Sequence, residues 1–65
     1  MNINTARQIL FCCTFAKITL HNGKETDFYN NEYISLKRDF YEFTDNDKQT
    51  FRYYYEDIDS IEVLS

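Results

Sequence analysis

Apolar and polar residues alternate along the chain beyond residue 16, in runs of about six residues rich in β-branched and aromatic types. Ile18 shares a face with Leu20, and Ile34 shares one with Leu36. The same spacing recurs later, at Tyr41 and Phe43, at Phe51, Tyr53 and Tyr55, and at Ile61 and Val63. This period of two is typical of half-buried strands, so the sequence predicts a mainly β fold.

Turn-forming residues separate these runs. Asn22-Gly23 suits a type I′ turn and predicts a hairpin, and further turn residues stand at 30–31, 37–39, 45–48 and 56–57. An open sheet this small would expose its edges and one apolar face. We therefore expect residues 1–65 to form a single domain, a small curled antiparallel meander or barrel of five or six strands.

Residues 5–16 allow two interpretations. Thr5 to Gln8 matches a capping box, and Ala6, Ile9 and Leu10 follow near helical spacing, which predicts a short N-terminal helix closing one end of the barrel. The run from Phe11 to Phe15 instead has strand character and could continue into the next strand. We favour the strand and keep the helix as the alternative.

The chain is short and acidic. A domain of this length buries only about 60% of the surface that its unfolded chain exposes, so its twelve aromatic rings must supply much of the core. The net charge is −4, and it is uneven: residues 1–38 carry five bases against three acids, whereas residues 39–65 carry eight acids against two bases. This balance disfavours nucleic acid and anionic membranes as partners.

Cys12 and Cys13 are adjacent, so a disulfide between them would be strained. We expect both to be buried structural thiols in a reducing compartment. The apolar run 9–16 is too short to span a bilayer and lacks the flanks of a signal peptide. We therefore expect a cytoplasmic protein.

The segment "ITLHNGKE", the short aromatic strands after it and the terminal "EDIDSIEVL" resemble small SH3-like, Sm-like and split-barrel proteins of Gram-positive bacteria and their phages. The resemblance covers residues 16–64 and implies a small barrel. Sm-type proteins bind RNA through loops with Arg or Lys and Gly. The last loop here offers Glu56 and Asp57 and no glycine, so RNA binding does not follow from the resemblance.

No motif indicates catalysis or a cofactor. Four side chains imitate the spacing of a calcium-binding EF-hand loop: Asp45, Asp47, Gln49 and Glu56. Thr50 stands where that loop needs glycine, and a strand pattern follows it, so we expect no metal. His21 is the single histidine and lies beside the Asn-Gly turn, away from any planned nucleophile. We expect a protein that is not an enzyme.

Strand alternation divides the tyrosine run. If Phe51, Tyr53 and Tyr55 face the core, Tyr54 points outward among carboxylates and suits a protein interface. The predicted partner-binding residues are Tyr54, Glu42, Glu56, Asp57, Asp59 and Glu62. Carboxylates around a tyrosine would steer a basic partner, as in a phage-encoded or mobile-element-encoded inhibitor that imitates a phosphate row. The alternative is that these acids only make the surface soluble.

Two further modes of interaction stay open. A single-stranded nucleic acid could stack on exposed rings beside basic side chains. The residues for that alternative are Lys37, Arg38, Phe40, Tyr41 and Arg52, together with Tyr54. The end "SIEVL" could instead pair edge to edge with a second copy and form a homodimer.

Overall fold

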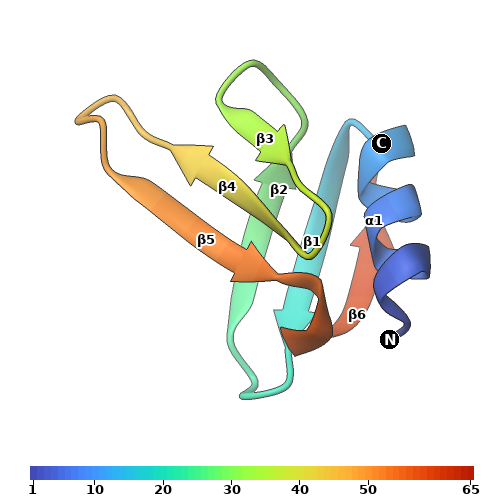
Figure 1. Cartoon of the computed structure of the whole chain (residues 1–65). Helices are drawn as coiled ribbons and strands as arrows, with labels where there is room; N and C mark the ends of the chain where they lie inside the picture. Colours follow the sequence, from blue (N-terminus) through green and yellow to red (C-terminus); the bar gives the residue numbers. More distant parts are fainter.

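The computed structural model describes residues 1–65 as one α-helix, six strands and one short 3-10 helix (Figure 1). In chain order these are α1 (Ile3–Cys12), β1 (Phe15–Leu20), β2 (Glu25–Tyr29), β3 (Ile34–Leu36), β4 (Phe40–Thr44), β5 (Thr50–Tyr54), η1 (Tyr55–Asp57) and β6 (Ile58–Val63). The prediction of a mainly β fold is confirmed.

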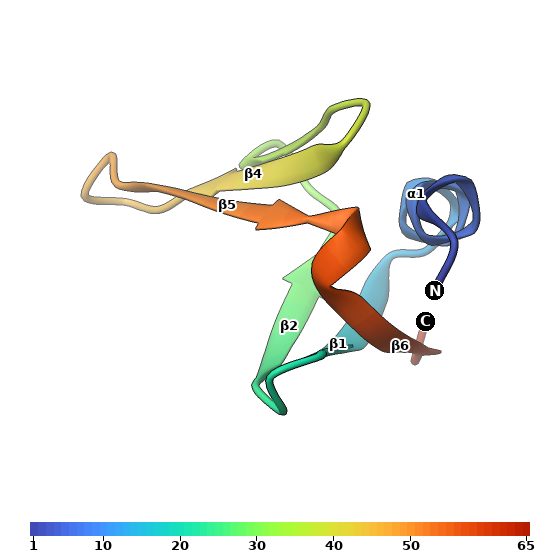
Figure 2. The same cartoon turned by 60° about the horizontal axis from the view of Figure 1, so that its bottom comes forward.

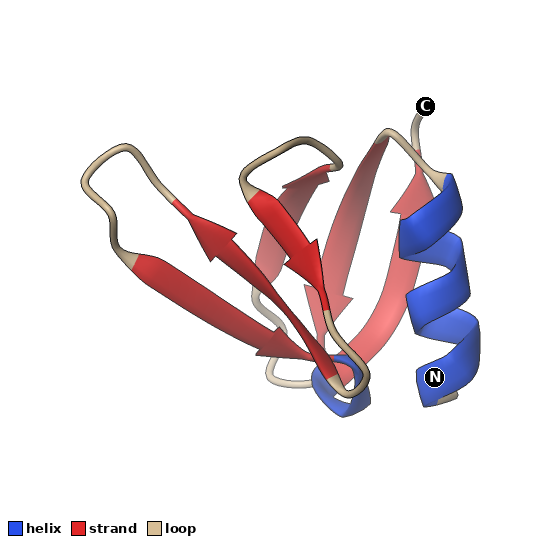
Figure 3. Cartoon of the chain, turned by 45° about the horizontal axis from the view of Figure 1, so that its top comes forward, coloured by secondary structure: helices blue, strands red, loops and turns tan.

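The strands form two antiparallel sheets of three strands each. We call the sheet with the order β2-β1-β6 the first sheet, and the sheet with the order β3-β4-β5 the second sheet. The β4–β5 hairpin projects past the first sheet on the side away from α1 (Figures 2 and 3). No strand pairing joins the two sheets, and a closed barrel is not seen.

The N-terminal segment is a helix, so the strand that we favoured there is wrong. Ala6 and Leu10 lie one turn apart and are fully buried, which fixes the face that α1 packs toward the core. Phe11 lies in the last turn of the helix and is 71% exposed, and Phe15 begins β1. The strand-like run is thus divided between two elements, because burial of Ala6 and Leu10 outweighs the local β preference of the aromatic and β-branched residues.

Both ends of α1 are capped by asparagines. Asn2, and not the predicted Thr5, is the N-cap: its Oδ1 accepts hydrogen bonds from the backbone N–H groups of Asn4 at 2.8 Å and Thr5 at 3.3 Å. At the other end, Asn30 Nδ2 donates to the carbonyl oxygens of Leu10 at 3.3 Å and Cys13 at 3.0 Å. Asn30 directly follows β2, so it ties the end of the helix to the first sheet.

Two hairpin turns share one design. In the β1–β2 turn the Gly23 N–H donates to the Leu20 carbonyl, and Gly23 has a φ of 88°. Asn22 does not have a positive φ, so the predicted hairpin is confirmed but its type I′ turn is wrong. In the β4–β5 turn the Lys48 N–H donates to the Asp45 carbonyl, and Lys48 has a φ of 64°. Lys48 therefore holds the left-handed position that glycine holds in the first turn.

The core is small and lies between the helix and the two sheets. It consists of nine buried residues: Ala6, Leu10, Cys13, Ala16, Ile18, Phe28, Tyr41, Tyr55 and Ile58. Phe28 of the first sheet meets Tyr41 of the second edge to face, at a centroid distance of 5.2 Å. This contact joins the two sheets within the core to which the helix contributes Ala6 and Leu10.

The shared turn design yields the first prediction. A non-glycine residue in the left-handed region costs roughly 1 kcal/mol, so Lys48→Gly should raise the free energy of unfolding by up to that amount, and Gly23→Ala should lower it by about as much. Urea denaturation measures both changes. Asn46→Gly is the matched control, because its φ is not positive and glycine there only adds freedom to the unfolded chain. Equal effects of Lys48→Gly and Asn46→Gly on stability would contradict the left-handed conformation of Lys48.

Candidate functional site

The second sheet has one aromatic face and one polar face, because successive residues on a strand point to opposite sides. The inner face carries Ile34, Leu36, Tyr41, Phe43, Phe51 and Tyr53. Its rings pair across β4 and β5: Tyr41 stacks on Tyr53 at 5.2 Å, and Phe43 stacks on Phe51 at 6.4 Å. These cross-strand pairs make the inner face a continuous aromatic surface.

Burial falls along this surface toward the tip of the β4–β5 hairpin. Tyr41 is 2% exposed, Tyr53 is partly buried, and Phe51 is 42% exposed. The predicted core position of Tyr55 is confirmed, since it is fully buried. Phe51 faces the predicted side but lies beyond the first sheet, so its predicted place in the core is wrong.

The uncovered part of the aromatic face borders a cleft of about 350 Å³. One wall is the edge of β2 at Asp27 and Tyr29. The other wall is the second sheet, with Phe43, Phe51 and Tyr53 beside Tyr41. We call this space the inter-sheet cleft. Its volume is at the lower end of the range of about 300–1,000 Å³ found for ligand pockets.

The buried hydroxyl of Tyr41, a residue of the cleft wall, has no partner. Tyr41 Oη is buried, and no group of the protein forms a hydrogen bond with it. Burial is also the main cause that raises the pKa of Tyr41 well above its ordinary value, with Tyr53 and Tyr55 adding to the effect. The hydroxyl therefore stays protonated and free to donate.

Tyr55 shows how a buried tyrosine is normally satisfied. Its hydroxyl donates to the Lys37 carbonyl at 2.8 Å. Burial raises the pKa of Tyr55, Arg7 opposes this rise, and Asp39 adds to it. The contrast with Tyr41 is informative, because the two rings belong to the same core and only one hydroxyl lacks an acceptor.

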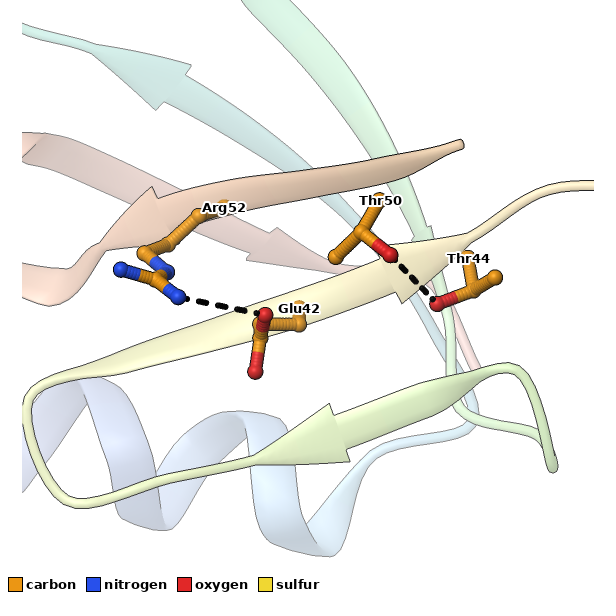
Figure 4. Close-up of polar contacts among 4 residues, drawn as sticks. All are labelled: Glu42, Thr44, Thr50 and Arg52. Carbon is orange, nitrogen blue, oxygen red and sulfur yellow. Dashed lines mark hydrogen bonds and ion pairs between the residues drawn. The ribbon is translucent and has the colours of Figure 1, made fainter. Parts of the chain in front are cut away.

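The outer face of the second sheet is polar and internally paired (Figure 4). The Arg52 guanidinium lies 4.3 Å from the Phe40 ring centroid, and its Nη2 lies 3.5 Å from Glu42 Oε2. Thr44 and Thr50 share a hydrogen bond of 3.2 Å between their hydroxyls. The nearby Tyr54 hydroxyl is the main cause that raises the pKa of Arg52, and Glu42 adds to it.

This arrangement weakens the nucleic-acid alternative. Tyr41 is buried, so its predicted role as an exposed stacking platform is wrong. Phe40 is partly buried, with the Arg52 guanidinium over its ring and the Tyr54 ring at 5.3 Å. Lys37 and Arg38 are exposed in the β3–β4 turn. A strand of bases would have to displace Arg52 before it could stack on Phe40.

The predicted acidic residues are spread over several surfaces. Tyr54, 38% exposed, and Asp57 border one polar depression between β5, η1 and the β1–β2 turn. Glu56 is exposed on η1 beside them. Asp59 lies across from the β1–β2 turn, where its Oδ1 is 3.3 Å from His21 Nδ1. These four residues lie close together in sequence and around one end of the sheets.

Two of the acids lie elsewhere. Glu42 is on the outer face of the second sheet and pairs with Arg52. Glu62 is on β6, directly opposite Lys17 in the first sheet. Because β6 pairs only with β1, its other edge is open. Formation of a homodimer along that edge stays a prediction.

The cysteines and the acids do not form a chemical centre. Cys13 is buried, and burial raises the pKa of its thiol, whereas Cys12 is exposed, so the prediction that both are buried is wrong for Cys12. Asp45 Oδ1 accepts hydrogen bonds from the N–H groups of Asp47 and Gln49 within the β4–β5 turn. No three His, Cys, Asp or Glu side chains converge as metal ligands would. The single α-helix is too short and too polar to cross a bilayer.

Comparison of the chain with protein families, with curated proteins and with solved structures gave no significant match.

The inter-sheet cleft was not predicted from the sequence. Its rings were found by strand alternation, but alternation assigns a residue to a face and does not show where the opposing sheet ends. The exposure of Phe51 near the hairpin tip indicates the cleft, and only the structure shows that exposure.

The two buried tyrosines yield the second prediction. Tyr41→Phe removes a buried hydroxyl without a partner and should raise the free energy of unfolding by about 1 kcal/mol. Tyr55→Phe removes a hydroxyl that has a partner and should lower it by about 1 kcal/mol. Urea denaturation of the two variants measures these opposite signs. A loss of stability in Tyr41→Phe would mean that Tyr41 Oη has an acceptor.

The third prediction concerns alkaline pH. The folded-state pKa of Tyr41 is raised, so its contribution to stability is complete below the unfolded pKa of about 10 and is lost as pH rises through the folded value. The free energy of unfolding should therefore fall above about pH 10, and Tyr41→Phe should make that fall shallower. Urea denaturation at about pH 8, 10 and 11 compares the slopes. If the free energy of unfolding fell equally steeply with pH in the wild-type chain and in Tyr41→Phe, the prediction would be wrong.

Proposed function

We propose that this chain is a small non-catalytic module that binds another protein through the inter-sheet cleft. The observation that carries the proposal is the uncovered aromatic face of the second sheet, where Phe51 lines the inter-sheet cleft and is 42% exposed. Aromatic side chains are enriched in the cores of protein interfaces, because they bury a large area at low entropic cost.

Acidic side chains favour a basic partner. The net charge is −4, and Tyr54, Glu56 and Asp57 border one end of the sheets. Charges at the rim of an interface act mainly on the rate of association and on the choice of partner. The cleft thus supplies affinity, while the acids select a basic surface.

Site-specific photo-crosslinking in cells tests the proposal, with a benzophenone amino acid placed at position 51 or at position 11. Phe11 is the matched control, because it is a phenylalanine that is 71% exposed on α1, the element opposite the projecting hairpin. We expect one protein to be linked from position 51 and not from position 11. Phe51→Ser should reduce capture of that protein at least about tenfold, and Phe11→Ser should not.

Two outcomes would contradict the proposal. One is equal crosslinking from both positions, which indicates non-specific contact. The other is a crosslink from position 51 to nucleic acid, which favours the alternative function. The acids are tested separately by replacing Glu56, Asp57 and Asp59 with Gln and Asn, which should slow association at low salt and leave dissociation nearly unchanged.

A further inference from the structure

The edge of β2 is unpaired along the inter-sheet cleft. In the β1–β2 pair the Leu20 N–H donates to the Lys24 carbonyl, and the Asn30 N–H donates to the Thr14 carbonyl. Because hydrogen-bonded pairs alternate with non-bonded pairs in an antiparallel ladder, Asp27 belongs to a non-bonded pair with Lys17. The backbone N–H and C=O groups of Asp27 therefore point away from β1. No strand pairs with that side of β2.

This open edge of β2 borders the cleft whose other wall is the aromatic surface. Asp27 and Tyr29 line one wall, and Phe43, Phe51 and Tyr53 line the other. A strand laid beside β2 would form main-chain hydrogen bonds with Asp27 and turn every second side chain toward the rings. The ring of Tyr41 belongs to the same wall, while its hydroxyl is buried.

The other face of the added strand would meet carboxylates. Glu25 and Asp27 are exposed and point to the outer face of the first sheet. Their only opposing base is Lys17, whose Nζ lies 3.0 Å from Glu25 Oε2 and which also stands opposite Glu62. The single ammonium of Lys17 therefore lies near three carboxylates, those of Glu25, Asp27 and Glu62. Basic side chains on an added strand would relieve this excess of negative charge.

We propose that β2 accepts an extended segment of a partner protein as an additional strand, and that this segment alternates apolar residues, which enter the inter-sheet cleft, with basic residues, which lie beside Glu25 and Asp27. This inference rests on the proposed function and specifies its mode of recognition. A second copy of this chain fits less well, because pairing β2 with itself would place the carboxylates of Asp27 opposite each other.

Short synthetic peptides test this mode. The first peptide alternates valine and lysine, the second contains the same residues as one valine block and one lysine block, and the third alternates valine and glutamate. We expect the first to bind at least about tenfold more tightly than the other two in calorimetric titration. N-methylation of every second residue of the first peptide, on the edge that pairs with β2, should abolish its binding. Equal affinity for the alternating and block peptides would overturn the inference, since charge alone would then explain binding.

Variants of the chain locate the added strand. Asp27→Pro removes the outward N–H that the strand would use, and proline is tolerated at such an edge position. Asp27→Ala is its matched control, because it removes the carboxylate and keeps the N–H. We expect Asp27→Pro to bind the alternating peptide at least about tenfold more weakly than Asp27→Ala. Phe51→Ser should also weaken binding, and Phe11→Ser should not.

Amide hydrogen exchange of the wild-type chain gives a readout that needs no variant. The Asp27 amide should exchange at least about tenfold more slowly when the alternating peptide is bound. Protection of this amide without peptide, together with a dimer in analytical ultracentrifugation, would show that a second copy occupies the edge and would overturn the inference. If position 51 crosslinks a protein in cells but no peptide protects Asp27, strand addition fails and the proposed function stands. If neither occurs, both fail.

Discussion

The packing of Phe28 against Tyr41 is the contact on which the rest of the fold depends. The two rings meet edge to face at 5.2 Å, and they are the main aromatic link between the first and second sheets. Such a pair stabilises by about 1 kcal/mol beyond the area that it buries, which matters in a chain with only nine buried residues. Tyr41 also contacts Tyr53 and Tyr55, so one side chain connects both sheets and η1.

The position of this contact explains the open cleft. The helix supplies Ala6 and Leu10 to the core, and it lies on the side of the sheets away from the β4–β5 hairpin. The sheets are therefore held together near the helix, while the hairpin continues past the last residue of the first sheet that could cover it. The partly buried ring of Phe43 and the exposed ring of Phe51 follow from an off-centre core.

The sequence predicted the elements better than their arrangement. The alternation of Tyr53, Tyr54 and Tyr55 indicated which rings turn inward, and Asn22-Gly23 indicated the first hairpin, because both signals are local. The helix was misjudged because its buried face rests on Ala6 and Leu10, whose burial depends on the distant Ile58 and Tyr55. The acids were expected on one face, but Glu42 and Glu62 belong to different sheets. Sheet membership is set by long-range pairing, which strand periodicity does not contain.

Three departures from ordinary local rules occur in the β4–β5 hairpin. Lys48 adopts a left-handed conformation at its tip, Phe51 exposes an aromatic ring beside the tip, and Tyr41 buries a hydroxyl without a partner at its base. Each costs free energy in the isolated chain, and stable folds tolerate such costs mainly where function requires them. A strand in the inter-sheet cleft would cover the exposed ring of Phe51, which lines that cleft. The exposed ring of Phe51 is therefore the feature of the hairpin that most directly supports the proposed partner.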